Sequence, residues 1–448
     1  MHVARLEITN VRGFYGARSV DLDLTRPDGS LAGWTVLAGR NGSGKSTFLQ
    51  ALAIALAGPR STSFIPSLAD WMSTGATTAE IRAVLSASDL DPRQQTLFDS
   101  SDTSPEVWIE FTRHPQLRGL EQDQTEPEFT GMGLDAFSQG QAVSSARSTS
   151  WGWFYAGYGP FRHLGSGGSA RAKTRYSKLA QQVASLFDET LPLTDAVDWL
   201  IDQHLYQLEN RSGAAQLLHT AMTLLGDGLL PDGFQVSKVD SDGLWVSREG
   251  STFPLREMSD GYRAVTALVV DIVRQMAVSY PDLKLEYRDH VPALPYPGVI
   301  LIDEVDDHLH VRWQKTVGMW LKTHFPQIQF IVTTHSPYVC QSADPGGLIL
   351  LPGPGENHPP RIIEQDLYER VVYGSGDDAV LTELFGVDTP YSAEAERMRR
   401  RLGELEVKVL QGTASVDEKE EFRTLSERLT SSMSARVDEV AARFGRER

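Results

Sequence analysis

Residues 39–46 read Gly-Arg-Asn-Gly-Ser-Gly-Lys-Ser, a glycine-rich turn that ends in a lysine and a hydroxyl residue. The apolar run Trp34–Ala38 precedes the turn and predicts a short buried strand. An apolar-rich segment from Ser46 to about Leu56 follows and predicts a helix, which Gly58-Pro59 ends. A turn of this kind between a strand and a helix binds phosphate, so the stretch predicts an α/β fold with a nucleotide site.

Each part of the turn has a chemical use. Glycines let the backbone curl so that successive N–H groups point at phosphate oxygens, and the positive end of the following helix faces the same anion. Lys45 is placed to contact the β- and γ-phosphates, and the Ser46 hydroxyl is placed to ligate Mg²⁺. We therefore predict that ATP and Mg²⁺ bind here, in contact with Gly39, Arg40, Asn41, Gly42, Ser43, Gly44, Lys45, Ser46 and Thr47.

A second pattern is the apolar run Gly298–Ile302 followed by Asp303 and Glu304. The run predicts a buried strand of a parallel sheet, and ligands of open α/β sheets bind at the carboxyl ends of such strands. Asp303 is predicted to hold Mg²⁺, directly or through water. Glu304 is predicted to polarise the attacking water as general base.

A third pattern is His335, which follows the predicted strand Gln329–Thr333. The imidazole there is predicted to hydrogen-bond the γ-phosphate or the attacking water, and so to act with Glu304 in catalysis. The alternative is a structural histidine. Zinc is not predicted for His308, His310 and His335, because their spacing supports no tetrahedral site.

A fourth pattern is Ser259-Asp260-Gly261 ahead of the helix predicted over Tyr262–Val278. Ser259 can be a simple helix N-cap.

The four patterns stand in the order found in ABC ATPases, and their detail resembles the RecF, OLD and SMC branch of that family. The opening segment Leu6–Phe14 resembles the first strand of that branch, which implies that Arg12 approaches the nucleotide. The run Asp303–His310 resembles the branch's Asp-Glu-x-x-x-His-Leu-His motif, which implies that Asp306 and Asp307 lie in a loop at a dimer interface. The resemblance implies a homodimer or higher oligomer, in which Ser259 and Gly261 serve the nucleotide of the opposite subunit.

The resemblance also implies a fold and a function. The expected fold is an ABC-type P-loop head, with a mixed or parallel central sheet, an antiparallel β subdomain, a helical insertion and a helical C-terminal tail. The compact insertion and charged tail are similar to those of bacterial anti-phage ATPases of the Septu (PtuA-like) kind, which implies an ATP-hydrolysing dimer switch that controls an effector such as a nuclease. A RecF-like DNA repair ATPase and an ATP-gated scaffold with negligible turnover remain alternatives.

Three departures from the family pattern stand out. The signature has Asp260 and Tyr262-Arg263 where transporter subunits have Gly and Gln. No glutamine is assigned to the loop that completes magnesium coordination, whose place Tyr158–Phe161 takes in our interpretation. No nuclease domain is expected after residue 390, so cleavage of nucleic acid would need a partner.

Composition bounds the alternatives. A net charge of −17 and a pI near 5.1 argue against a protein coated for non-specific nucleic-acid binding. A local basic stretch, formed by Arg162, Arg171, Lys173, Arg175 and Lys178, is either a solvated helix face or a DNA-binding patch. The single cysteine, Cys340, excludes an intramolecular disulfide, and no signal peptide or membrane span is expected, so we predict a cytoplasmic protein.

The remaining sequence completes the expected organisation. Four domains are predicted: an ATPase lobe over 1–164, a helical insertion over 165–230, a second ATPase lobe over 231–370 and a helical region over 371–448. Residues 87–150 are expected to be mostly loop, with Glu106–Arg113 as their only strand. The pattern predicts helix from Lys178 to about Leu225, a hairpin over Phe234–Val246, a polar loop over Tyr280–Pro297 and a helical hairpin over Ser392–Arg448.

Overall fold

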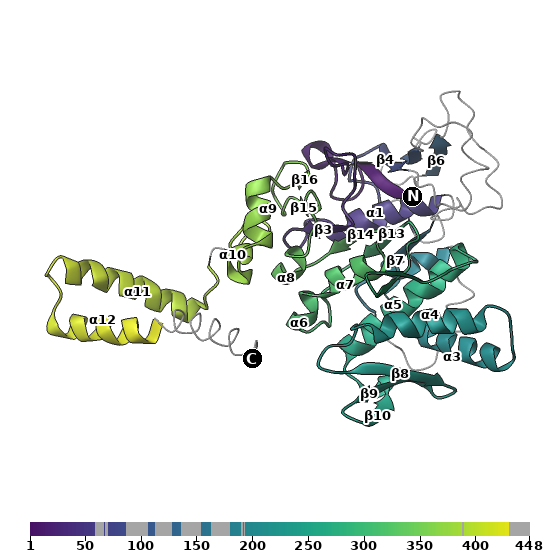
Figure 1. Cartoon of the computed structure of the whole chain (residues 1–448). Helices are drawn as coiled ribbons and strands as arrows, with labels where there is room; N and C mark the ends of the chain where they lie inside the picture. The colour runs from purple at the N-terminus through teal and green to yellow at the C-terminus, as the bar shows by residue number, and fades with distance from the viewer. Residues whose placement is uncertain are drawn as a thin grey trace. The chain divides into compact units, whose positions relative to one another are not determined.

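The structure, a computed structural model, describes residues 1–58, 67, 70–86, 106–112, 128–135, 154–162, 180–189, 191, 193–387 and 389–429. The chain divides into two units, Met1–Ala379 and Val380–Arg448 (Figure 1). The predicted division into four domains stays a prediction.

A mixed sheet forms the centre of the first unit. Its strands lie in the order β16-β15-β3-β14-β13-β7, and all pairs are parallel except β15 with β16. The middle strands are buried along their whole length, as expected of parallel strands covered on both faces. The bounds are β3 (Trp34–Ala38), β7 (Tyr155–Tyr158), β13 (Gly298–Ile302), β14 (Ile328–Thr333), β15 (Leu348–Leu350) and β16 (Arg361–Ile362).

A second, antiparallel sheet has the strand order β2-β1-β4-β5-β6. Its strands alternate buried and exposed residues wherever their burial is described, so one face of the sheet packs on the core. Strand β6 lies in the segment expected to be loop outside Glu106–Arg113, so that expectation is wrong there. The bounds are β1 (His2–Thr9), β2 (Val20–Asp23), β4 (Thr78–Ser86), β5 (Glu106–Thr112) and β6 (Glu128–Asp135).

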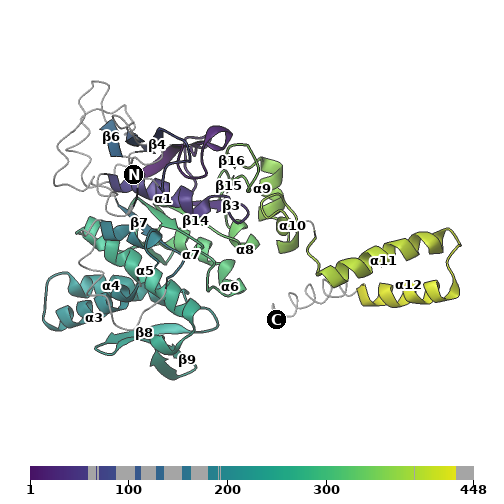
Figure 2. The same cartoon turned by 180° about the vertical axis from the view of Figure 1, so that it is seen from behind.

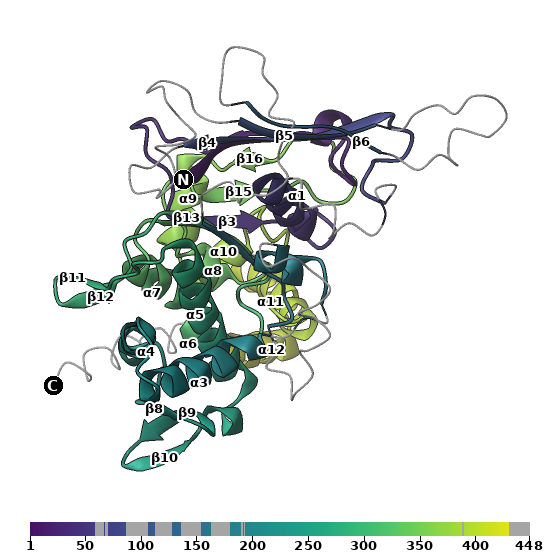
Figure 3. The same cartoon turned by 90° about the vertical axis from the view of Figure 1, so that its right-hand side faces the viewer.

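Helix α1 (Lys45–Ala57) lies between the two sheets (Figure 3). Every residue from Ala51 to Ala57 is buried, so the helix has no solvent face over about two turns. A helix that is apolar on all sides is stable only inside a core. Its first turn begins at the glycine-rich loop, which the packing of α1 therefore fixes against both sheets.

The helical segment ahead of the signature is shorter than predicted. Helices α3 (Thr194–Leu208) and α4 (Ala214–Gly226) pack on α5 (Asp260–Ser279), but residues 180–186 form the 3-10 turns η4 (Ala180–Gln182) and η5 (Ala184–Leu186). Turn η5 lies against β7, because Gly157 and Gly159 have no side chain there. A Cβ at Gly159 would lie 2.1 Å from the Ser185 carbonyl oxygen. The predicted helix is therefore wrong over residues 180–189, 191 and 193, and Lys178 lies outside the described residues.

The predicted hairpin is part of a small three-stranded sheet. Strands β8 (Gln235–Asp240), β9 (Gly243–Arg248) and β10 (Ser251–Pro254) pair antiparallel, and the turn η6 (Leu255–Glu257) leads from β10 toward α5. Residues 280–297, predicted as loop, contain a further hairpin of β11 (Glu286–Arg288) and β12 (Val291–Ala293). Its turn residues Asp289 and His290 both have positive φ, as a type I′ turn requires. Most turns of this type contain a glycine, which this turn lacks.

Short elements complete the described structure. They are η1 (Gly16–Arg18), α6 (Val311–Gln314), α7 (Val317–His324), α8 (Pro337–Cys340), α9 (Gln365–Val372) and α10 (Gly376–Val380). In the second unit, α11 (Ala393–Leu410) and α12 (Val416–Leu429) form a helical hairpin, side by side in Figure 2. The prediction is thus confirmed as far as Leu429, and residues 430–448 lie outside the described residues. Within the described residues, none of the helices combines the length and apolar content that crossing a bilayer would need.

Together the two sheets and the helical parts confirm the predicted α/β head. Its parts are those predicted for an ABC-type P-loop head: a mixed central sheet, an antiparallel β subdomain and helical additions.

Candidate nucleotide site

The glycine-rich loop has the backbone that a phosphate cradle needs. Gly39, Gly42 and Gly44 have φ values of 152°, 78° and 97°, which side-chain-bearing residues rarely adopt. A Cβ at Gly39 would lie 2.8 Å from Ser43 Oγ, and one at Gly44 would lie 2.8 Å from Phe14 Cζ. The loop therefore tolerates no side chain at either position, and it leads into the N-terminus of α1, where a helix can bind an anion.

The Lys45 side chain is buried within this loop. Its Nζ donates hydrogen bonds to the carbonyl oxygens of Gly39 at 2.8 Å and Arg40 at 3.3 Å. Burial lowers the pKa of Lys45, while the nearby carboxylates of Asp303, Glu304 and Asp306 raise it. The ammonium thus lies close to both the loop and the second predicted motif.

Asp303 and Glu304 follow directly from the end of β13. Asp303 is 4% exposed, its N–H donates to the Tyr158 carbonyl oxygen at 2.8 Å, and its carboxylate accepts a hydrogen bond from Thr333 Oγ1. The Glu304 N–H donates to the same Thr333 oxygen at 2.7 Å. Thr333 ends β14, so the two central strands hold both carboxylates at the carboxyl edge of the sheet, where nucleotides bind in open α/β folds.

Glu304 has two unusual properties. Its φ is +46°, in the left-handed region that a glutamate rarely occupies. Burial raises its pKa, and the carboxylates of Asp303, Asp307 and Asp306 raise it further, whereas Lys45 lowers it. A carboxylate with a raised pKa is a better proton acceptor than an ordinary one, as a general base requires.

His335 lies at the same edge, two residues after β14. Partial burial lowers its pKa, and the Lys45 ammonium lowers it further. The main-chain N–H of His335 and the Thr334 hydroxyl both donate hydrogen bonds to Asp306 Oδ1. The structure therefore places Lys45 and Asp303 within electrostatic reach of both Glu304 and His335.

Mg²⁺ would find two of its expected ligands here. Ser46 lies in the first turn of α1, and Asp303 offers a carboxylate held by Thr333. Hydroxyl, carboxylate and phosphate oxygens are the ligands this ion prefers. The Tyr158–Phe161 segment lies beside Asp303, since the Tyr158 carbonyl accepts its N–H, but the Tyr158 hydroxyl donates to Asp271 at 3.0 Å. Tyr158 thus supplies no substitute for the glutamine of the family pattern.

The signature segment forms the start of helix α5. Ser259 is the N-cap residue of α5, but its side chain makes no capping hydrogen bond. Gly261 packs against the loop after Glu304, and a Cβ there would lie 2.3 Å from the His308 carbonyl oxygen. The simple N-cap alternative therefore lacks the hydrogen bond that would define it, and Gly261 is required for the close approach of two backbones.

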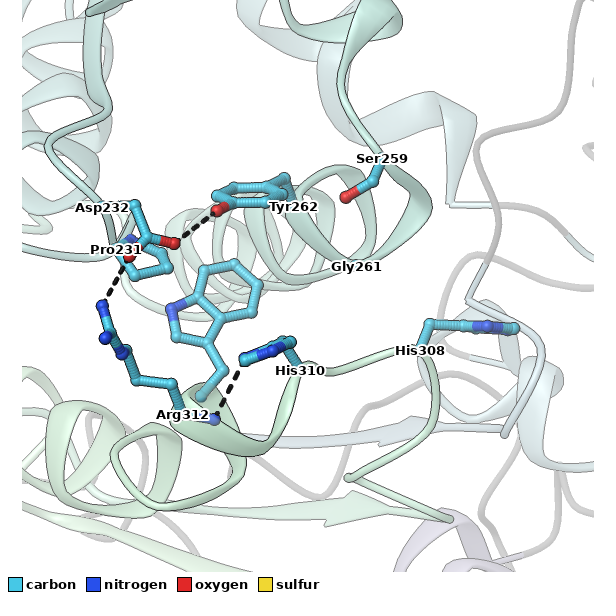
Figure 4. A pocket seen from close by; sticks show the side chains of 9 residues that line it. Pro231, Asp232, Ser259, Gly261, Tyr262, His308, His310 and Arg312 are labelled. Atoms are coloured by element: carbon cyan, nitrogen blue, oxygen red, sulfur yellow. Dashed lines mark hydrogen bonds and ion pairs between the residues drawn. The ribbon is translucent and has the colours of Figure 1, made fainter. Parts of the chain in front are cut away.

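A small pocket opens beside this segment (Figure 4). Within it, Asp232 accepts a hydrogen bond from the Tyr262 hydroxyl at 3.2 Å and pairs with Arg312 at 2.5 Å. The pocket joins the signature to the His308–Trp313 segment. Its lining residues are Pro231, Asp232, Ser259, Gly261, Tyr262, His308, His310, Arg312 and Trp313.

Two arginines singled out from the sequence lie in different settings. Arg12 is exposed, and its guanidinium stacks on Trp71 at 4.3 Å and donates to Gln50 Oε1 at 3.1 Å. Its predicted approach to the nucleotide stays a prediction. Arg162, assigned from sequence to a basic surface, is 5% exposed and bonds to the main chain of Asp303 and Glu304. That assignment is wrong for Arg162, and Arg171, Lys173, Arg175 and Lys178 lie outside the described residues.

Two family models match the chain around these motifs. One, described as "AAA domain", matches residues 5–113. The other, described as "AAA domain, putative AbiEii toxin, Type IV TA system", matches residues 206–341. Together they include the glycine-rich loop, the signature, Asp303-Glu304 and His335.

Curated relatives point the same way. The Septu protein PtuA of Bacillus mycoides (strain KBAB4) is 26% identical over 339 residues, which are 75% of this chain and 38% of that protein. The chain resembles PtuA-like ATPases. The "Retron Vc95 probable ATPase" of Vibrio cholerae serotype O1 biovar El Tor is 36% identical over 108 residues, 24% of this chain and 20% of that protein. These matches confirm the resemblance to PtuA-like ATPases, although the chain spans less than half the length of either relative.

Solved structures of SMC heads also align with the chain. One, a head bound to the C-winged helix domain of ScpA, has a TM-score of 0.46 and 16% identity, and covers 81% of this chain and 98% of that one. The SMC head domain from Thermotoga maritima has a TM-score of 0.41 and 17% identity, with coverage of 81% and 98%.

Proposed function

We propose that this chain hydrolyses ATP and uses the nucleotide to open and close a homodimer. The observation that supports this most is the convergence of Lys45, Asp303, Glu304 and His335 at the carboxyl edge of the central sheet. ATP would lie on the glycine-rich loop with its phosphates at the start of α1. Ser46 and Asp303 would hold Mg²⁺, which neutralises charge on the phosphates when bound.

The chain's own groups have distinct roles in this proposal. Lys45 exchanges its bonds to the loop carbonyls for the β- and γ-phosphates. Glu304, with its raised pKa, accepts a proton from the attacking water. His335, with its lowered pKa, is neutral near pH 7 and can donate one hydrogen bond to the γ-phosphate or orient the water.

The signature supports the dimeric part of the proposal. The Ser259 hydroxyl is exposed and caps no amide of α5, so it is available to a ligand from outside its own chain. The start of α5 adds a positive helix end. We infer that Ser259 and Gly261 complete the nucleotide site of a second copy, and that hydrolysis separates the two copies.

Similarity to Septu and retron ATPases supports a role in bacterial anti-phage defence, with control of an effector such as a nuclease as the output. A RecF-like role in DNA repair is the second candidate, supported by the order of the motifs alone. A neighbouring nuclease gene would favour the first. DNA binding by the purified chain without an effector would favour the second.

Single-turnover hydrolysis tests the central proposal. Excess full-length protein is mixed with radiolabelled ATP and Mg²⁺, and phosphate release is followed with and without a chelator. We expect one turnover per bound nucleotide, abolished by the chelator. Tight ATP binding with no release above the uncatalysed rate would instead identify an ATP-gated scaffold.

A further inference from the structure

Arg162 occupies an unusual position for an arginine. It follows β7 and the Tyr158–Phe161 segment and is 5% exposed. Within the described residues, the hydrogen bonds of its Nη atoms all end on main-chain carbonyl oxygens. Nη1 donates to Gly159 at 3.0 Å and to Asp303 at 2.6 Å, and Nη2 donates to Glu304 at 2.7 Å.

The guanidinium thus spans the two residues on which hydrolysis would depend. Its two Nη groups bond to consecutive carbonyls, which fixes the peptide between Asp303 and Glu304. Glu304 has a φ of +46°, and a glutamate keeps such a conformation only where its surroundings enforce it. Thr333 fixes the Glu304 N–H, and Arg162 fixes its carbonyl.

We propose that Arg162 is a positioning residue for ATP hydrolysis, which holds the Asp303–Glu304 backbone so that the Glu304 carboxylate meets the attacking water. This inference rests on the proposed role of Glu304 as general base. Arg162 touches neither the water nor the nucleotide in this arrangement and acts through the two main-chain carbonyls.

Charge supports the same role. Asp303, Glu304, Asp306 and Asp307 all interact electrostatically with Arg162. An arginine remains charged even where burial lowers its pKa, as it does here. Arg162 therefore adds a permanent positive charge to this group of carboxylates, with which Lys45 of the glycine-rich loop also interacts.

The geometry also accounts for the choice of an arginine. A guanidinium is a rigid planar fork with several donors, so it reaches two neighbouring carbonyls with little loss of side-chain freedom. A lysine keeps the charge but donates from a single nitrogen on a flexible stem. We therefore expect lysine to replace it only in part.

The test compares Arg162→Met and Arg162→Lys with the wild type in the full-length protein. ATP affinity is measured by titration calorimetry, and kcat and KM by phosphate release. Displacing a catalytic group by about 1 Å can cost about 10²-fold in rate, so we expect a kcat loss of about that size for Arg162→Met with ATP affinity little changed. Arg162→Lys should fall between Arg162→Met and the wild type.

Two controls separate positioning from stability. Arg26→Met removes a guanidinium that bonds to the Pro345 carbonyl at 2.7 Å and pairs with Asp344, but that makes no contact with Asp303 or Glu304 among the described residues, and it should leave kcat unchanged. Combined with Glu304→Gln, Arg162→Met should slow hydrolysis little further, because both changes act through one carboxylate. If Arg162→Met fails to fold, the kcat of Arg162→Lys alone tests the positioning role.

The outcomes are distinct. The first case is that the wild type hydrolyses ATP and Glu304→Gln does not. A normal kcat in either folded Arg162 variant would then overturn the positioning role. Independent, multiplicative losses in the double variant would also overturn it. Normal turnover in Glu304→Gln would instead defeat the proposed function on which the inference rests.

Discussion

The edge of the central sheet and the signature segment differ in how completely their own chain holds them. At the sheet edge, Asp303 and Glu304 are fixed by Thr333 and by the Arg162 guanidinium, and Lys45 is bonded to its loop. In the signature, the Ser259 hydroxyl is exposed and makes no capping bond. The first region is organised before any partner arrives. Within the described residues, the second presents a hydroxyl that makes no capping hydrogen bond.

This difference suggests that the two regions have different roles in the proposed dimer, catalysis at the sheet edge and contact with the second copy at the signature. Groups that act on the reacting phosphate gain from being preorganised, because no binding energy is then spent on arranging them. A group that reports the arrival of a second copy must stay accessible until that copy binds. Each prediction below alters one region and asks whether the other responds.

The largest effect is expected from Glu304→Gln at the sheet edge. The amide keeps the shape of the side chain but cannot accept a proton, and loss of a general base costs about 10²–10⁴ in rate. Calorimetry should find ATP affinity preserved while phosphate release slows. Near-normal release would mean that another residue is the base, and His335→Ala would then be examined first.

The next effect tests whether the signature belongs to the neighbouring site. Ser259→Arg should bind ATP nearly normally but fail to hydrolyse it, because a bulky side chain replaces a small hydroxyl facing the second nucleotide.

Lys45→Ala should lose about tenfold or more in ATP affinity, the size of a hydrogen bond to a charged group.

Mixing the two inactive variants sharpens the test. A mixed dimer contains one intact loop facing one intact signature, so partial hydrolysis should return, measured as phosphate release against mixing ratio. A monodisperse monomer that hydrolyses ATP at the full rate would contradict the shared site and leave Ser259 as an ordinary residue at a helix start.

A smaller effect on kcat is expected from a change in pH. The ordinary pKa of a glutamate is near 4.5, and burial with nearby carboxylates raises that of Glu304. The base is active when deprotonated, so kcat should fall as the pH drops through a value above 4.5. Stopped assays across the acid range would measure this limb, which Glu304→Gln should lack. A rate that stays flat down to the ordinary glutamate value would argue against Glu304.

The sequence predicted the organised region better than the open one. Trp34–Ala38 and Gly298–Ile302 were bounded correctly, because a continuous apolar run that stops at a glycine turn or a pair of acids is typical of a buried parallel strand. The loop and the carboxylates lie together because parallel strands bring their carboxyl ends to one edge. Local pattern and global topology agree there.

What the sequence did not predict depends on contacts between distant segments. In the sequence, Arg162 is one cation of an acid-free stretch, and only the pairing of β7 with β13 turns it toward Asp303. Gly261 has the pattern of a helix-start residue, yet the reason for its small size is the His308 carbonyl. The β11–β12 turn was missed because Asp289 and His290, not glycines, adopt its positive φ values.

The smallest effect on ATP affinity is expected from removing the helical hairpin of the second unit. A chain ending at Pro390 lacks α11 and α12, which contribute none of the predicted site residues. ATP affinity should therefore be unchanged, while a contact with an oligomer or effector is lost. The exposed apolar residues Val407, Leu410 and Val416, at 52%, 80% and 83%, are candidates for that contact. A folded truncation that no longer binds ATP would contradict this division.

Helix α1 has a consequence for how the molecule opens. Its buried residues belong to one continuous hydrophobic cluster that includes Leu6 and Ile81 from the antiparallel sheet and Leu301 and Ile331 from the central one. If either sheet separated from the core, it would expose apolar side chains of α1 that also pack against the other sheet. The amide hydrogens of both sheets next to α1 should therefore exchange with solvent as one cooperative group. The element that begins at the phosphates is thus also the one that makes two sheets a single foldon.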